Sequence, residues 1–147
     1  MVSVPVSGSV QASDIATYCG SSYQYAWQLT QNGYVKAYAL VPGQGYWLKS
    51  DYDCNFPVSG DAYTGTPAVL FSGWNLVGAG GNDLSAVDSA GTCQITAGPW
   101  YYSKSSGSSA GSYVYASTLS PGKAYWIKVP SACTLGSGGE QPPAPPS

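Results

Sequence analysis

The chain of 147 residues has no histidine and no arginine, and only 8% of its residues are charged, whereas about 25% are charged in a typical soluble protein. Without histidine, a Ser-His-Asp triad, a Cys-His dyad and a histidine metal site are all excluded. A glycosidase would need two facing carboxylates, and the one glutamate, Glu140, lies in the C-terminal tail. We therefore expect a protein that is not an enzyme and has no cofactor.

Basic clusters and long apolar runs are also missing. The five lysines are spread along the chain, whereas nucleic acid binding needs several cations along one face. No apolar run approaches the roughly 18 residues that span a bilayer, and the chain does not start with the basic and apolar regions of a signal peptide. We expect no nucleic acid partner and no membrane insertion, and we expect Met1 to begin an expressed fragment.

A segment of 21 residues occurs twice. Residues 34–54 read YVKAYALVPGQGYWLKSDYDC, and residues 113–133 read YVYASTLSPGKAYWIKVPSAC. At an offset of 79 they align without a gap and share ten residues, which indicates an internal duplication. The match extends upstream, where Trp27 corresponds approximately to Trp100. The duplication divides the chain into a first unit, residues 1–57, and a second unit, residues 58–135. We expect the first unit to be truncated at its first strand. We expect residues 136–147 to form a disordered Gly/Pro-rich linker, and such a linker normally leads to further domains.

Each unit contains one early and one late cysteine. An even number of cysteines, no CxxC motif and no histidine favour disulfides in an oxidising compartment, either extracellular or at the cell surface. Sequence alone allows three pairings. Because each unit should be able to close its own loop, we predict the bridges Cys19–Cys54 and Cys93–Cys133.

The local patterns indicate strands almost throughout. Residues 35–40 and 114–119 are rich in β-formers, Pro-Gly marks a turn after each, and residues 46–49 and 125–129 leave the turns as strands. We therefore expect a hairpin at each Pro-Gly. We predict an all-β fold of two similar disulfide-stapled units, sandwich- or barrel-like, that form one compact module. The only segments that could hold a helical turn are 10–17 and 84–90, with Ser13 or Asn82-Asp83 as caps. Both are short enough to be loops instead.

Strand alternation separates the two aromatic residues of the repeated motif. Tyr125 shares a face with Ile127, whereas Trp126 shares the opposite face with Lys128. We expect Tyr125 in the core and Trp126 on the solvent side. The first unit repeats the pattern, with Tyr46 inward and Trp47 and Lys49 outward. Since a packing residue would also be kept in both units, burial of Trp47 and Trp126 stays an open alternative.

Aromatic residues are the most suitable candidates for a binding site. A flat aromatic ring on a β-surface stacks on the apolar face of a pyranose, while neighbouring amides, hydroxyls and lysines bond the sugar hydroxyls. Trp74 lies in the most apolar segment, and we expect it in the core. The remaining candidates lie among polar residues or in the repeated strand, namely Trp27, Trp100, Tyr101 and Tyr102, followed by Trp47, Trp126, Lys49 and Lys128.

One short stretch has the spacing of oxygen ligands. Asp51, Asp53 and Asn55 alternate like the start of a calcium loop, but the glycine and the distal glutamate of such a loop are missing. The simpler alternative is that the two acids solubilise a loop beside a disulfide. We therefore expect no metal ion.

The motifs WNLV at 74–77, PGQGYWL at 42–48 and PGKAYWI at 121–127 resemble the repeated β-rich units of multidomain secreted and cell-surface proteins of bacteria and archaea. The Pro-rich tail and the aromatic content are also similar to carbohydrate-binding modules of modular polysaccharide-degrading enzymes. These resemblances imply a non-catalytic extracellular module whose partner is a polysaccharide. The alternative is a structural or adhesive surface or fibre protein without a small-ligand site.

Overall fold

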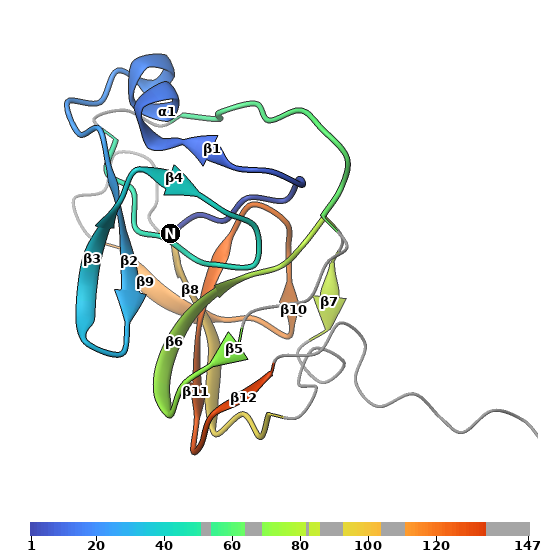
Figure 1. Ribbon diagram of the computed structural model, residues 1–147. Helices are drawn as coiled ribbons and strands as arrows, with labels where there is room; N and C mark the ends of the chain where they lie inside the picture. The colour runs from blue at the N-terminus through green and yellow to red at the C-terminus, as the bar shows by residue number, and fades with distance from the viewer. Residues whose placement is uncertain (51–53, 64–68, 82, 86–92, 104–110, 135–147) are drawn as a thin grey trace, which may run out of the picture.

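A computed structural model describes residues 1–50, 54–63, 69–81, 83–85, 93–103 and 111–134 (Figure 1). The fold is all-β, as predicted, and the described residues also form one short helix. Its elements in chain order are β1 (Val10–Gln11), α1 (Ala12–Cys19), β2 (Ala26–Thr30), β3 (Gly33–Ala37), β4 (Ala39–Leu40), β5 (Val69–Leu70), β6 (Gly73–Gly78), β7 (Leu84–Ser85), β8 (Ala97–Ser103), β9 (Ser112–Tyr115), β10 (Thr118–Leu119), β11 (Ala124–Val129) and β12 (Cys133–Thr134).

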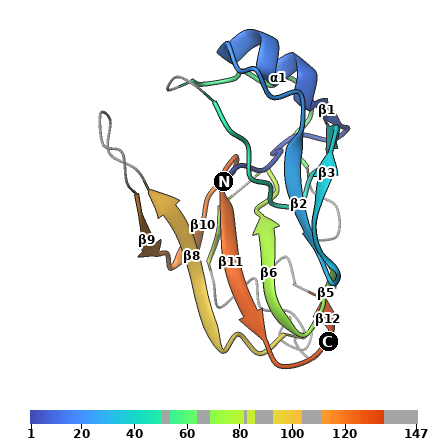
Figure 2. The same ribbon diagram turned by 90° about the vertical axis from the view of Figure 1, so that its left-hand side faces the viewer.

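The two units have the same strand pairing. In the second unit, β6, β11, β8 and β9 form a four-stranded antiparallel sheet in that order (Figure 2). Strand β10 pairs with β7. In the first unit β2 pairs with β3, β4 pairs with β1, and Trp47 bridges Trp27 of β2. Val2 bridges Tyr46 in the position that Val77 of β6 takes beside Tyr125. The internal duplication therefore exists in the topology as well as in the sequence.

The predicted Pro-Gly hairpins are wrong in both units. The strands before the turns, β4 and β10, pair with β1 and β7, and β11 pairs with β6 and β8. Each turn is instead held by the tyrosine that follows it. The Tyr125 hydroxyl accepts a hydrogen bond from the Ser120 N–H at 2.8 Å, and the Tyr46 hydroxyl accepts one from the Val41 N–H at 3.0 Å. Both tyrosines are buried, as the alternation predicted. Burial raises the pKa of Tyr46, and the hydrogen bond from Val41 opposes this shift.

The Pro-Gly turns connect the two units. Gln44 in the first turn bridges Val77 of β6, and the Gly45 N–H donates to the Leu76 carbonyl at 3.1 Å. At the corresponding place in the other unit, Val2 bridges Lys123 of the second turn. Each turn thus pairs with the strand of the other unit, so the two units form one module.

Gly45 lies at a close approach between the units. A methyl group there would lie 2.8 Å from the Leu76 Cγ and 2.9 Å from the Ala124 Cβ. We expect Gly45→Ala to lower the free energy of unfolding by about 1–3 kcal/mol, because overpacking displaces its neighbours. Denaturant titration measures the loss. Combining Gly45→Ala with Ala124→Gly should cost less than the two single changes added together. Fully additive losses would contradict the steric explanation.

Each unit has a hydrophobic core of its own. The first consists of Val4, Ala12, Ile15, Cys19, Ala26, Ala37, Leu40 and Tyr46. The second consists of Leu70, Val77, Ala79, Cys93, Leu119, Tyr125, Ile127 and Val129. Both predicted disulfides are present, Cys19–Cys54 with a Cα–Cα distance of 5.6 Å and Cys93–Cys133 with one of 5.2 Å. Each bridge therefore fixes the core of one unit to a later segment of the same unit.

The helical predictions are partly wrong. Helix α1 follows Gln11 without a side-chain cap and ends at Gly20, whose φ is +70°. Ser13, the predicted cap, lies inside the helix, where its carbonyl accepts a hydrogen bond from the Thr17 hydroxyl at 2.9 Å. The second candidate begins with strand β7, and residues 86–90 lie outside the described residues, as do Asn82 and the predicted linker. No helix in the described part of the chain is long and apolar enough to cross a membrane.

Candidate functional site

Three tryptophans occupy the face of the four-stranded sheet that points away from the core. In the register of the sheet Trp126 of β11 lies opposite Trp100 of β8, and Lys128 lies opposite Trp74 of β6. Cross-strand partners project from the same face, which is the face opposite to the buried Tyr125. The rings of Trp74 and Trp126 meet edge to face with their centroids 6.2 Å apart.

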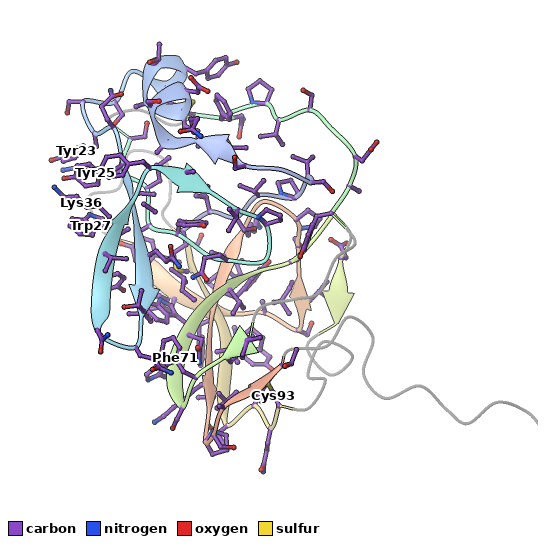
Figure 3. All side chains as sticks on the ribbon, in the orientation of Figure 1. Tyr23, Tyr25, Trp27, Lys36, Phe71 and Cys93 are labelled. Carbon is purple, nitrogen blue, oxygen red and sulfur yellow. A yellow bond between two sulfur atoms is a disulfide. The ribbon has the colours of Figure 1, made fainter. Side chains whose placement is uncertain are left out.

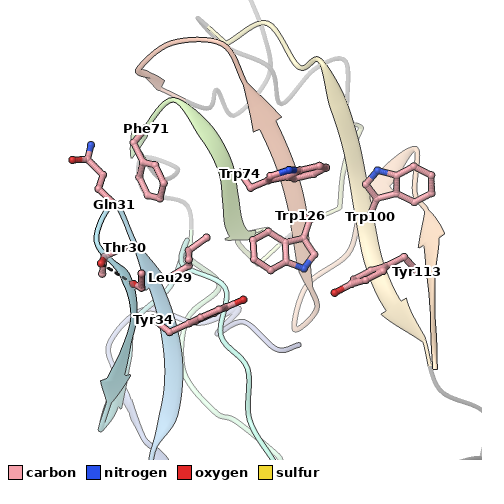
Figure 4. A pocket seen from close by; sticks show the side chains of 10 residues that line it. Leu29, Thr30, Gln31, Tyr34, Phe71, Trp74, Trp100, Tyr113 and Trp126 are labelled. Carbon is pink, nitrogen blue, oxygen red and sulfur yellow. Dashed lines mark hydrogen bonds between the residues drawn. The ribbon is translucent and has the colours of Figure 1, made fainter. Parts of the chain in front are cut away.

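The hairpin of β2 and β3 faces these tryptophans across a cleft of about 700 Å³ (Figure 4). The hairpin contributes Leu29, Thr30, Gln31, Gly33 and Tyr34, and the second unit contributes Phe71, Trp74, Trp100, Tyr113 and Trp126. Figure 4 shows Trp126 in the middle of the cleft, with Tyr34 on the hairpin side and Trp100 and Tyr113 on the other side. We call this site the large cleft.

A tight turn fixes the tip of the hairpin. Gly33 has a φ of +101°, a conformation that glycine adopts without a steric penalty. The Thr30 hydroxyl donates to the Gly33 carbonyl at 2.8 Å and accepts a hydrogen bond from the Asn32 N–H at 3.2 Å. The tip of the hairpin beside Tyr34 is therefore fixed by the backbone conformation of Gly33 and by the two hydrogen bonds of the Thr30 hydroxyl.

The large cleft is chemically apolar and aromatic with a few polar groups. The described residues that line it include no charged side chain, and its polar groups come from Thr30, Gln31, the tyrosine hydroxyls and the indole N–H groups. Trp74 is 40% exposed and Tyr113 is 51% exposed. The Lys128 Nζ lies 5.8 Å from the centroid of the Trp74 ring. Such a surface suits a ligand that has both apolar faces and hydroxyl groups.

A second cleft of about 450 Å³ lies on the first unit. Trp27, Tyr34 and Trp47 line this small cleft. The Trp47 Nε1–H donates to the Tyr34 hydroxyl at 3.2 Å. The Trp47 ring also contacts Tyr102 of β8, with centroids 5.6 Å apart. The small cleft therefore lies beside the second unit.

A row of aromatic rings continues from Trp27 to Tyr25 and Tyr23 along the outer side of the hairpin, with Lys36 beside it (Figure 3). Lys49 lies beside the Tyr23 end of this row. Tyr25 contacts Trp27 and Tyr23 edge to face, with centroid distances of 5.4 and 6.0 Å. The Lys36 Nζ lies 4.4 Å from the Tyr25 centroid, and the Lys49 Nζ lies 5.1 Å from the Tyr23 centroid. Lys49, a predicted site residue, is thus placed beside this row and lines neither cleft.

The structure gathers most of the predicted site residues at the two clefts. Trp100 and Trp126 line the large cleft, Trp27 and Trp47 line the small one, Tyr102 contacts Trp47, and Lys128 lies beside Trp74. Both repeated tryptophans, Trp47 and Trp126, lie on the outer face and are half-buried.

Tyr101 does not belong with its neighbours in the sequence. Its ring packs toward the core, with its centroid 6.0 Å from that of Tyr125, and the Lys123 Nζ lies 4.9 Å from its centroid. Successive residues of a strand point to opposite faces, so Tyr101 points away from the face that carries Trp100 and Tyr102. The prediction that it is a site residue is not supported by its position.

The expected burial of Trp74 is wrong, since this residue is a main component of the large cleft. Its neighbour Asn75, which is 3% exposed, turns inward instead. Its Oδ1 accepts from the Phe71 N–H at 3.0 Å, and its Nδ2 donates to the carbonyls of Phe71 at 2.8 Å and Gly73 at 3.1 Å. These bonds satisfy the buried amide and leave Trp74 on the outer face.

The weak metal candidate gains nothing from the structure. Asp51 and Asp53 lie outside the described residues, and Asn55 is exposed. Within the described ranges, no three His, Cys, Asp or Glu side chains lie close enough to hold a metal ion.

A scan against protein-family models, a search of curated proteins and a search of solved structures found no match. The chemistry of the two clefts is therefore the main indication of function.

Proposed function

We propose that this protein is a non-catalytic, extracellular polysaccharide-binding module whose ligand occupies the large cleft. The observation that carries the proposal is the group of exposed Trp74 and half-buried Trp100 and Trp126 on one sheet face, opposite Tyr34 of the hairpin. Contiguous exposed aromatic side chains on a protein surface often mark a binding site. A pyranose ring stacked on an indole would fill the cleft with apolar contact.

The polar groups of the cleft are suited to a neutral ligand rich in hydroxyls. Hydroxyl groups of Thr30 and tyrosine, the Gln31 amide and the indole N–H groups can each donate or accept hydrogen bonds from a sugar. The described lining residues include no carboxylate, whereas glycoside hydrolysis needs two, and this favours binding without catalysis. The two disulfides favour an oxidising compartment, which supports an extracellular or cell-surface location.

Affinity electrophoresis tests the proposal. The protein is run in gels that contain cellulose derivatives, xylan, mannan, soluble chitin, starch or pectin, and we expect at least one of them to retard it. Trp74→Ala should abolish the retardation with little loss of stability, because Trp74 is 40% exposed. Tyr18→Ala is the matched control, since Tyr18 lies on α1 and is 60% exposed.

The outcomes separate the ligand from its location. If no polysaccharide retards the protein, the proposed function is wrong. If Trp74→Ala is retarded as strongly as the wild type, the polysaccharide binds outside the large cleft.

The alternative function is a structural or adhesive surface or fibre protein. One observation favours it: β9 lies at the edge of its sheet, and all of its residues are exposed, including Tyr113 and Tyr115. An exposed edge strand can pair with another chain. In contrast, Val2 already pairs with Tyr46 at the first-strand position of the first unit. Sedimentation equilibrium should show a concentration-dependent oligomer if β9 pairs with a second copy.

A further inference from the structure

The three residues that line the small cleft each have a counterpart in the large cleft. At the repeat offset of 79, Tyr34 corresponds to Tyr113 and Trp47 to Trp126. The third member also matches, because Trp27 bridges Trp47 just as Trp100 pairs with Trp126. Each unit thus presents the same three aromatic residues, and in each unit these three line a cleft.

The two hydrophobic cores do not require aromatic residues at all three of these repeated positions. Tyr34 is 48% exposed, Tyr113 is 51% exposed and Trp27 is 39% exposed. None of the three belongs to either hydrophobic core. The stabilising contacts of these side chains are therefore too few to explain the repeated trio by packing alone.

The two clefts are adjacent and share a lining residue. Tyr34 lines both of them. On the other side, the ring of Trp47 contacts Tyr102, and Tyr102 contacts Tyr113 of the large cleft, with centroid distances of 5.6 and 5.5 Å. Aromatic side chains therefore connect one cleft to the other without interruption.

The difference in size between the clefts has a structural explanation. Leu29 pairs with Tyr34, and Tyr102 pairs with Tyr113, so these two residues occupy equivalent positions. Leu29 lines the large cleft, whereas the bulkier Tyr102 contacts Trp47 beside the small one. Phe71 and Trp74 extend only the large cleft. The small cleft should consequently bind its sugar more weakly.

We propose that the small cleft is a second sugar-binding subsite and that one linear polysaccharide chain lies along both clefts. This inference rests on the proposed function. When one chain occupies one cleft, the next part of the same chain is held near the other at high effective concentration. The protein would therefore select long chains over short oligosaccharides of the same sugar.

Isothermal titration calorimetry tests this with short and long oligosaccharides cut from the polysaccharide that retards the protein. We expect two short oligosaccharides to bind each protein molecule, but only one long oligosaccharide, with an affinity higher by a factor of ~10². Trp27→Ala should remove one of the two short-chain sites and reduce the long-chain affinity to that of the short chain. Trp27 lines only the small cleft, so the large cleft should keep its affinity.

Two further variants serve as controls for a folding defect. Trp27→Leu keeps an apolar side chain on β2 but removes the flat ring, and it should behave like Trp27→Ala. Tyr18→Ala should bind as the wild type does. A single short-chain site in the wild type, or two long chains bound per molecule, would overturn the inference. Unchanged long-chain affinity in both Trp27 variants would do the same, and in all three cases the proposed function would stand. No binding to any polysaccharide would overturn both.

Discussion

Reduction of both disulfides should unfold most of the protein at room temperature. Cys19–Cys54 joins residues 35 apart in the sequence and Cys93–Cys133 joins residues 40 apart. Loops of this length restrict the unfolded chain by about 4 kcal/mol each on the chain-entropy model. The free energy of unfolding of a small protein is about 5–15 kcal/mol, so losing both bridges removes a large part of it.

Guanidinium titrations with and without reductant, followed by near-UV circular dichroism of the tryptophans, measure this loss. The paired variants Cys19→Ala/Cys54→Ala and Cys93→Ala/Cys133→Ala should each lose about half of the total. Because the Pro-Gly turns pair each unit with the other, both variants should still unfold in a single transition. The variant without any cysteine serves as the control, since it should resemble the reduced wild type and reductant should not change its circular dichroism spectrum. An unchanged midpoint after complete reduction of the wild type would contradict the prediction.

The features that sequence could predict depend on local rules or on the repeat. The offset of the duplication identified the two units, and loop closure within each unit led to the correct bridges, Cys19–Cys54 and Cys93–Cys133. The alternation of strand residues placed Tyr46 and Tyr125 in the cores. Both rules need only neighbouring residues or a comparison of the chain with itself, so they do not require knowledge of the long-range pairing.

Strand pairing could not be predicted in this way. A Pro-Gly turn starts a hairpin and a crossover equally well, and which one forms depends on the partners of the flanking strands. Here the preceding strand β10 pairs with β7, whereas β11 lies between β6 and β8. The turns are then free to pair with the other unit, as Gln44 does with Val77.

The candidate site was predicted only in part because it forms between the units. The outer face with Trp100 and Trp126 follows from strand alternation, but the opposite wall comes from the tip of a hairpin in the other unit. The Asn32-Gly33 dipeptide is a strong hairpin signal and could have located that tip. Trp74 was predicted in the core because it lies in an apolar run, and such runs are usually buried. Asn75 turns inward instead because it bonds the backbone of Phe71 and Gly73, and these hydrogen bonds cannot be recognised in the sequence.

Trp126→Ala should weaken binding to the polysaccharide that retards the protein in affinity electrophoresis by about 30-fold or more. Figure 4 places Trp126 in the middle of the large cleft, between Tyr34 and Trp100. Central aromatic residues of a binding site typically contribute at least about 2 kcal/mol to the binding free energy, which corresponds to about 30-fold in affinity. The neighbouring core residues Tyr125 and Ile127 point to the opposite face, so the change should leave the fold intact.

Isothermal titration with the wild type, Trp126→Ala and Trp126→Phe measures the contribution of the flat ring. Trp126→Phe keeps a ring that can stack on a sugar and should recover most of the lost affinity. Near-UV and far-UV circular dichroism confirm that each variant is folded. If Trp126→Phe loses as much affinity as Trp126→Ala, stacking on this ring does not drive binding. If neither variant differs from the wild type, the polysaccharide does not occupy the large cleft.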